Sequence, residues 1–163
     1  KYAYEKGYDI AVQFDGDGQH DISYVKNIIK PIINNEADMV IGSRFIDKNS
    51  SDFKSSKTRR IGINIISFFI KLITKKKIYD TTSGFRAVNS TLIKYFAHDY
   101  PAEYPEPVST TKVLKNDYKV NEIAVSMNER DGGVSSIRAW KNIYYMFNVI
   151  LSIIAFGLEE KKK

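Results

Sequence analysis

The spacing of apolar residues predicts a strand, a helix and a second strand at the start of the chain. Residues 10–14 are a short apolar run, typical of a buried strand, and they end at the carboxylate-rich segment 15–21. Five apolar residues then recur at helical spacing: Val25, Ile28, Ile29, Ile32 and Ile33. Asp21 or Ser23 is the expected N-cap of this helix, and residues 37–42 predict the next buried strand. This order indicates a crossover unit, which builds parallel sheets.

The remaining pattern adds helices and loops to this unit. Residues 61–73 carry apolar side chains at helical spacing, between a polar segment at 46–57 and a turn-rich loop at 80–86. Further along we expect, in order, an extended run at 87–89, an irregular loop at 98–107, the start of a helix at 109–114, an alternating strand at 120–127 and a charged loop at 128–136. The fold class that follows is α/β, with a mostly parallel central sheet flanked by helices.

Length and composition fit one ordinary globular domain. The chain has 163 residues, of which 43% are hydrophobic and 27% charged, which is enough apolar mass for a core. We assign residues 1–138 to the α/β domain and residues 139–163 to a C-terminal apolar helix. The absence of cysteine excludes a disulfide framework and a thiolate zinc site. Because the chain opens with Lys1 and has no apolar signal-peptide core, we expect a mature product or an internal fragment.

The positive charge of the chain is concentrated in one segment. The net charge is +6, from 25 Lys and Arg against 19 Asp and Glu. Residues 53–79 contain eight cations and no carboxylate: Lys54, Lys57, Arg59, Arg60, Lys71, Lys75, Lys76 and Lys77. A local excess of this kind indicates an anionic partner, such as a phosphate, a nucleotide or an anionic membrane surface.

The C-terminal helix has the composition of a membrane-surface element. Residues 143–158 are sixteen residues without a charge, and Trp140, Tyr144 and Tyr145 stand near their start. A transmembrane helix needs roughly 20 apolar residues, so this segment is marginal as a span. We expect an interfacial membrane helix with its aromatic residues at headgroup level. The alternative is a helix that packs on the domain.

Asp15, Gly16 and Asp17 place two carboxylates on a tight turn directly after the first predicted strand. Open α/β sheets bind ligands at the carboxyl ends of their strands. Closely spaced oxygen donors suit a hard cation, Mg²⁺ or Mn²⁺, and Gln19 adds a neutral oxygen. A solvated Asp-Gly turn is the alternative. An EF-hand is excluded, since His20 stands where its loop needs Gly and a lysine where it needs a bidentate Glu.

Five arginines are candidates for binding phosphate groups: Arg44, Arg59, Arg60, Arg86 and Arg130. The guanidinium is a planar cation with several donors, and several of them converging on one cleft would suit a diphosphate and an acceptor phosphate. Ser83 and Gly84 would let the backbone approach a sugar or phosphate closely, although an ordinary turn needs the same residues. His20 and His98 have no partner at metal-ligand spacing, so we assign neither a catalytic role.

These motifs resemble, in order and spacing, the family 2 glycosyltransferases of the GT-A fold, and among them the synthases of dolichyl- or polyprenyl-phosphate sugars. The resemblance rests on an Asp-x-Asp block at 15–20, Gly42-Ser43-Arg44-Phe45, Arg59-Arg60 before an apolar helix, the block 80–86 and the block 129–136. Two positions depart from the pattern. Ser136 stands where the dolichyl-phosphate mannose branch usually has Lys, and Val108 stands where relatives often have Glu.

The resemblance implies transfer of a sugar from a nucleotide-diphosphate sugar to a lipid phosphate at the cytoplasmic membrane face, with inversion at the anomeric carbon. It implies catalytic roles for Asp15, Asp17 and Arg130, with Mg²⁺ or Mn²⁺ held by Asp15, Asp17 and Gln19. The residues expected to bind substrate are Arg44, Arg59, Arg60, Ser83, Gly84, Arg86 and Ser135. The family's first strand, which holds the nucleotide base, is expected upstream of this chain.

The sequence leaves three alternatives open. The acceptor could be a sugar hydroxyl of a growing polysaccharide, with Glu106 or Asp131 as the base. The chain could be a non-catalytic module that binds phosphate or nucleic acid through its basic cluster. We expect no nucleic-acid partner, because the cluster is interleaved with Ile and Phe and the acidic loop at 15–21 would repel phosphate. Finally, the fragment alone could be inactive without the base-binding strand.

Overall fold

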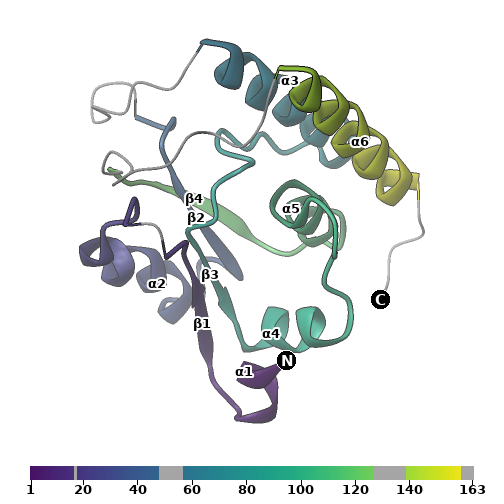
Figure 1. The fold of residues 1–163 in the computed structure, drawn as a ribbon. Coiled ribbons are helices and arrows are strands. Elements are labelled where there is room, and N and C mark those ends of the chain that lie inside the picture. The colour runs from purple at the N-terminus through teal and green to yellow at the C-terminus, as the bar shows by residue number, and fades with distance from the viewer. Residues whose placement is uncertain (17, 48–56, 127–138, 159–163) are drawn as a thin grey trace.

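The computed structural model describes residues 1–16, 18–47, 57–126 and 139–158. A four-stranded sheet in the order β1-β3-β2-β4 lies between helices on its two faces (Figure 1). The strands are β1 (Ile10–Gln13), β2 (Met39–Ser43), β3 (Arg86–Asn89) and β4 (Val120–Ala124). The expected α/β fold, with a central sheet flanked by helices, is confirmed, but the expected mostly parallel pairing is not, because two of the three strand pairs are antiparallel.

The sheet is mixed in its strand pairing. β2 and β4 pair in parallel, with Met39 opposite Val120. β3 pairs antiparallel with both β1 and β2, so that Ala87 lies opposite Val12 on one side and Val40 on the other. β1, β2 and β4 therefore run in one direction, as the crossover unit predicts, but β1 and β2 are not neighbours. The sequence pattern predicted an extended run at 87–89, but such a pattern carries no information on strand direction.

The helices divide between the two faces of the sheet. On one face lie the short helix η1 (Ile22–Tyr24) and α2 (Val25–Ile33). The other face carries α3 (Lys57–Thr74), α4 (Ser90–His98), α5 (Pro105–Lys115) and α6 (Ala139–Leu158), and α1 (Tyr2–Glu5) packs against α4. The Asp21 carboxylate accepts the Ser23 N–H and caps η1, which leads directly into α2, whereas α2 itself has no side-chain cap.

Two parts of the helical prediction differ from the structure. The sequence pattern gave no helix over residues 90–98, where α4 begins after an Asn89 cap that accepts the Leu92 N–H. The prediction of an irregular loop over residues 98–107 is wrong at its C-terminal end, because α5 begins at Pro105. Proline is well suited to the first helical turn, where its missing N–H has no intrahelical partner.

The core has two layers, one on each side of the sheet. Toward α2, the fully or nearly buried side chains include Ile28, Val40 and Phe85. Toward the other helices they include Met39 and Ile41 from β2, packed with residues of α3, α5 and α6. Successive residues of β2 thus point to opposite layers, which explains why this strand is apolar throughout.

α6 packs on the domain in parallel with α3. Val149 and Ile153 of α6 are fully buried in the core. A Cβ added at Gly62 would lie 3.2 Å from the sulfur of Met146, and one at Gly157 would lie 2.8 Å from Ile73. The starts of the two helices therefore meet, and so do their ends. Across the described residues, none of the helices is long and apolar enough to cross a membrane.

α6 should contribute to stability through one face only. Replacing Ile153 with Ala should lower the free energy of unfolding by about 2–5 kcal/mol, because it leaves a cavity in the core. The matched control is Leu151→Ala on the same helix, where the side chain is 48% exposed; we expect a loss of less than about 1 kcal/mol. Urea denaturation measures both. Equal losses would contradict the packing of α6 described here.

Candidate active site

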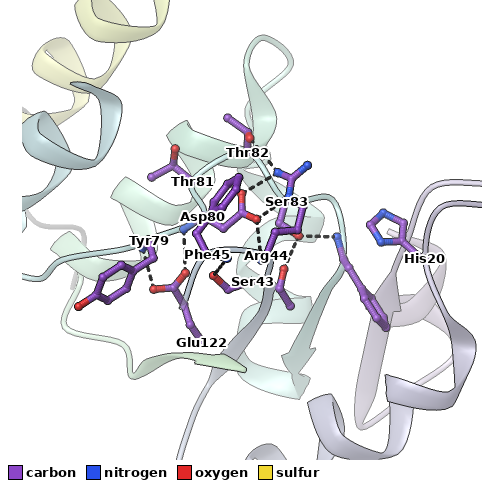
Figure 2. A network of polar contacts seen from close by, with 12 residues as sticks. His20, Ser43, Arg44, Phe45, Tyr79, Asp80, Thr81, Thr82, Ser83 and Glu122 are labelled. Carbon is purple, nitrogen blue, oxygen red and sulfur yellow. Dashed lines mark hydrogen bonds and ion pairs between the residues drawn. The ribbon is translucent and has the colours of Figure 1, made fainter. Parts of the chain in front are cut away.

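The functional loops gather at the edge of the sheet where β1 and β2 end and β3 begins. Asp15 follows the end of β1 by two residues, and Arg44 directly follows β2. Because β3 runs in the opposite direction, the loop 80–85 reaches the same edge (Figure 2). The carboxyl ends of strands in open α/β sheets are where ligands bind, so this edge is the candidate site.

Arg44 is held in a buried ion pair with Asp80. Its Nε and Nη2 atoms donate to the two carboxylate oxygens of Asp80, each at 2.7 Å, and its backbone N–H donates to the same carboxylate at 3.1 Å. Nη2 also donates to the Thr82 hydroxyl at 3.2 Å. Asp80 is fully buried and Arg44 is 6% exposed. The two-point contact fixes the plane of the guanidinium as well as the position of its charge.

The loop that carries Asp80 is anchored to two strands. The Glu122 carboxylate on β4 accepts the backbone N–H groups of Tyr79 and Asp80, each at 2.8 Å (Figure 2). Burial raises the pKa of Glu122, and the two backbone hydrogen bonds oppose that shift. The Ser83 hydroxyl donates to the Gly42 carbonyl at the end of β2, at 2.6 Å. Ser83 therefore fixes the loop from its other end.

Asp15 lies against the backbone of Gly84. A Cβ atom at Gly84 would lie 2.9 Å from one carboxylate oxygen of Asp15 and 3.0 Å from the other, so a side chain there would displace this carboxylate. The Nε2 atom of His20 lies 3.4 Å from Oδ2 of Asp15, and the His20 ring packs 5.2 Å from the ring of Phe85. The Asp15 side chain is still 62% exposed. Its carboxylate is thus oriented by the protein and open to solvent.

Arg86 is buried at the start of β3, where it joins the loop to α5. Its Nε donates to the Ser83 carbonyl at 2.7 Å, and Nη1 donates to the Glu106 carbonyl at 2.9 Å and to the Ser109 hydroxyl at 3.0 Å. Burial lowers the pKa of Arg86, and the nearby Glu106 carboxylate opposes this shift. These contacts fix the start of α5 relative to the edge of the sheet.

The consecutive arginines at the start of α3 have different neighbours. The guanidinium carbon of Arg60 lies 5.4 Å from the centre of the Phe45 ring, and that of Arg44 lies 5.3 Å from the same ring. Arg59 instead lies within electrostatic range of the Tyr145 hydroxyl on α6, where it opposes the rise in pKa that burial causes. Arg60 is therefore the member of the pair that shares an aromatic neighbour with Arg44.

Several residues predicted from the sequence lie outside the described part of the chain: Asp17, Arg130, Asp131 and Ser135. Gln19 is half-buried and has contacts within the protein. The side chains that are described include no group of three or more His, Asp or Glu arranged to hold a metal ion. The predicted residues that gather at or beside the edge are Asp15, Arg44, Arg60, Ser83, Gly84 and Arg86.

Four residues of this edge were given no role by the sequence prediction: His20, Phe45, Asp80 and Glu122. Asp80 opens a turn, where a carboxylate is commonly a local cap and not the partner of a distant arginine. Glu122 occupies a polar position of an alternating strand, a pattern that usually indicates a side chain in solvent. His20 has no partner at metal-ligand spacing in the sequence. Its contact with Asp15 depends on the conformation of the loop after β1.

Replacing Glu122 with Gln should destabilise the chain by about 1–3 kcal/mol, because the amide nitrogen, itself a donor, would face one of the two backbone N–H groups that the two carboxylate oxygens accept. The effect should depend on pH. A carboxyl group whose pKa is raised on folding destabilises the folded state when ionised, so wild type should gain stability from Glu122 as the pH falls toward the unfolded pKa. The difference in unfolding free energy between the two chains, measured in urea, should therefore be larger near pH 5 than near pH 7. An unchanged difference would contradict this account of Glu122.

Comparison with known proteins identifies a family that the chain matches. Residues 5–96 match the family described as Glycosyl transferase family 2. The UDP-N-acetylglucosamine–dolichyl-phosphate N-acetylglucosaminyltransferase of Methanococcus voltae is 35% identical over 77% of this chain and 50% of its own length. An uncharacterised protein of Methanocaldococcus jannaschii is 32% identical over 71% of this chain and 48% of its own length. The polyprenol monophosphomannose synthase of Mycolicibacterium smegmatis is 24% identical over 88% of this chain and 55% of its own length.

The chain spans about half the length of the curated relatives it matches. The family match includes β1, β2 and β3 and therefore contains Asp15, Arg44 and the loop 80–85. The resemblance found in the sequence motifs is confirmed by this match and by the α/β architecture. The chain belongs to the family 2 glycosyltransferases.

Proposed function

We propose that the protein containing this chain transfers a sugar from a nucleotide-diphosphate sugar to a polyprenyl phosphate. One relative is named for transfer of N-acetylglucosamine to dolichyl phosphate, and another for the synthesis of polyprenol monophosphomannose. The observation that carries the proposal is the arginine pair at the edge of the sheet, where Arg44 and Arg60 share the ring of Phe45. Guanidinium groups match the oxygens of a phosphate acceptor.

The segment after β1 fits a divalent cation of the Mg²⁺ or Mn²⁺ kind. Asp15 presents an exposed carboxylate held over Gly84, and Asp17 and Gln19 add oxygen donors on the same short segment. We assign these three residues as the ligands. A cation bound there would neutralise the charge that develops on the leaving nucleoside diphosphate.

In the proposed transfer, an oxygen of the acceptor phosphate attacks the anomeric carbon of the sugar. The bond from that carbon to the diphosphate breaks, and the nucleoside diphosphate leaves with the electron pair. Attack opposite the leaving group inverts the configuration. A phosphate oxygen is already anionic at neutral pH, so the step needs no strong general base, whereas a sugar hydroxyl would. We assign Arg44 and Arg60 to orienting the acceptor, Arg130 a catalytic role and Ser135 a contact with substrate.

An assay with a nucleotide-sugar and a short polyprenyl phosphate tests this proposal in the full-length protein. We expect transfer that is lost with EDTA and restored by Mn²⁺, and Asp15→Asn should lower its rate by about 100-fold or more, because a neutral amide replaces a charged ligand. Asp9→Asn is the matched control, an exposed carboxylate at the other end of β1. Full activity in EDTA would overturn the metal assignment. Transfer to a saccharide hydroxyl but not to the lipid phosphate would overturn the acceptor.

We also propose that the protein lies on the cytoplasmic face of a membrane through α3 and α6. Each helix buries one side in the core and exposes an apolar stripe on the other, which we name the α3–α6 face. Its members are Ile61, Ile65, Phe68 and Leu72 of α3 and Tyr144, Phe147, Leu151, Ile154 and Leu158 of α6. Leu72, Ile154 and Leu158 line one groove, so the two stripes open on the same side.

The charges around the α3–α6 face favour an anionic lipid surface. Arg59 and Arg60 stand exposed at the start of α3, and Lys71, Lys75, Lys76 and Lys77 stand exposed at or beyond its end. The cytoplasmic leaflet is anionic, and each basic residue near it contributes about 1 kcal/mol. Apolar side chains between two basic ends are the composition of a helix pair that lies in the membrane interface.

Co-sedimentation with phosphatidylserine vesicles tests the membrane proposal. Binding should weaken with salt but persist in part, because burial of apolar side chains is not screened. Phe68→Ser with Phe147→Ser should remove the salt-resistant part. The matched control is Ile22→Ser with Ile33→Ser, two side chains that are 67% and 62% exposed near and on α2. No binding at low salt, or equal loss in both double variants, would overturn the role of this face.

A further inference from the structure

Asp80 makes more contacts with Arg44 than an ion pair requires. The carboxylate receives the Nε, the Nη2 and the backbone N–H of the same arginine, at 2.7, 2.7 and 3.1 Å. A point contact between charges leaves an arginine side chain free to swing about its long stem. Three contacts to one carboxylate fix both the start and the tip of the side chain, and with them the direction in which the guanidinium faces.

We propose that Asp80 is a positioning residue that orients Arg44 toward the acceptor phosphate. This inference rests on the proposed function, because it gives Asp80 its role through the acceptor site. Arg44 directly follows β2, and the guanidinium carbons of Arg44 and Arg60 lie 5.3 and 5.4 Å from the centre of one ring, that of Phe45. Two cations beside the same ring repel each other, so a carboxylate paired with one of them lowers the cost of holding both in place.

The position of Asp80 is itself set by the sheet. Its backbone N–H and that of Tyr79 donate to Glu122 on β4, and Ser83 ties the far side of the loop to Gly42 on β2 (Figure 2). β2 and β4 are paired in parallel through the same segment, with Ile41 opposite Glu122. Two paired strands, and not the loop alone, therefore fix the orientation of Arg44.

The matched control is a second ion pair of the same length elsewhere in the chain. Lys112 on α5 donates to Asp99 at 2.7 Å, and the lysine side chain is 8% exposed. Asp99→Asn breaks this pair without touching the edge of the sheet. Thr82→Val provides a milder change at Arg44 itself, since it removes the hydroxyl that accepts from Nη2 and keeps the shape of the side chain.

The test measures binding by calorimetry to the full-length protein, with farnesyl phosphate as the acceptor probe, farnesol as its uncharged counterpart and UDP as the donor probe. We expect Asp80→Asn to weaken binding of farnesyl phosphate about tenfold or more and Thr82→Val to weaken it by a smaller factor. Binding of UDP and farnesol should not change. Asp99→Asn should lower the melting temperature and leave all three affinities as in wild type.

Each outcome decides one of the two proposals. If Arg44→Ala weakens farnesyl phosphate binding but Asp80→Asn and Thr82→Val do not, the positioning role is wrong and the acceptor site stands. If Arg44→Ala and Arg60→Ala both leave that binding unchanged, the acceptor site itself is wrong. Equal weakening of farnesyl phosphate and UDP by Asp80→Asn would reduce Asp80 to a structural role. Should Asp80→Asn fail to fold, Thr82→Val decides the question by the same comparison.

Discussion

The reversed direction of β3 is the constraint on which the site depends. β1 and β2 run in parallel and end at one edge of the sheet, and β3 lies between them with the opposite polarity. A third parallel strand in that place would deliver its preceding loop to the far edge. Because β3 is antiparallel, the loop that leads into it arrives beside Asp15 and Arg44. The close contact of Asp15 with Gly84 and the pairing of Arg44 with Asp80 both follow from this one choice of direction.

Buried charged side chains hold the loop at this edge, and burying them costs desolvation free energy. Taking an ion pair out of water costs several kcal/mol per ion, and a well-packed apolar substitute is often as stable. Three direct hydrogen bonds between Arg44 and Asp80 offset the desolvation cost of that pair. Hydrogen bonds to carbonyl and hydroxyl oxygens offset the cost of burying Arg86. An apolar cluster would hold the loop equally well, but it would present no cation at the edge.

Local patterns in the sequence predicted most of the elements and the location of the site. The apolar run at 10–14 and the helical spacing from Val25 to Ile33 correspond to β1 and α2, and Asp15 and Arg44 lie at strand ends as expected. What could not be predicted depends on long-range geometry. Periodicity gives no strand direction, so the placement of β3 was missed. The partners of Arg44 lie 36 and 38 residues away, and no local spacing marks Asp80 or Thr82 as its acceptors.

The parallel packing of helices has an electrostatic consequence of its own. α3 and α6 run side by side in one direction, and α5 joins them, since Tyr104 meets Tyr145 at one end and Lys115 donates to the Phe156 carbonyl at the other. Each helix carries about half a positive charge at its N-terminus. Three such ends lie together on the side of the molecule that holds Arg59, Arg60 and Glu106, while Lys115 neutralises carbonyls at the opposite end. The peptide backbone therefore contributes positive charge on that side, and this contribution does not depend on any single arginine.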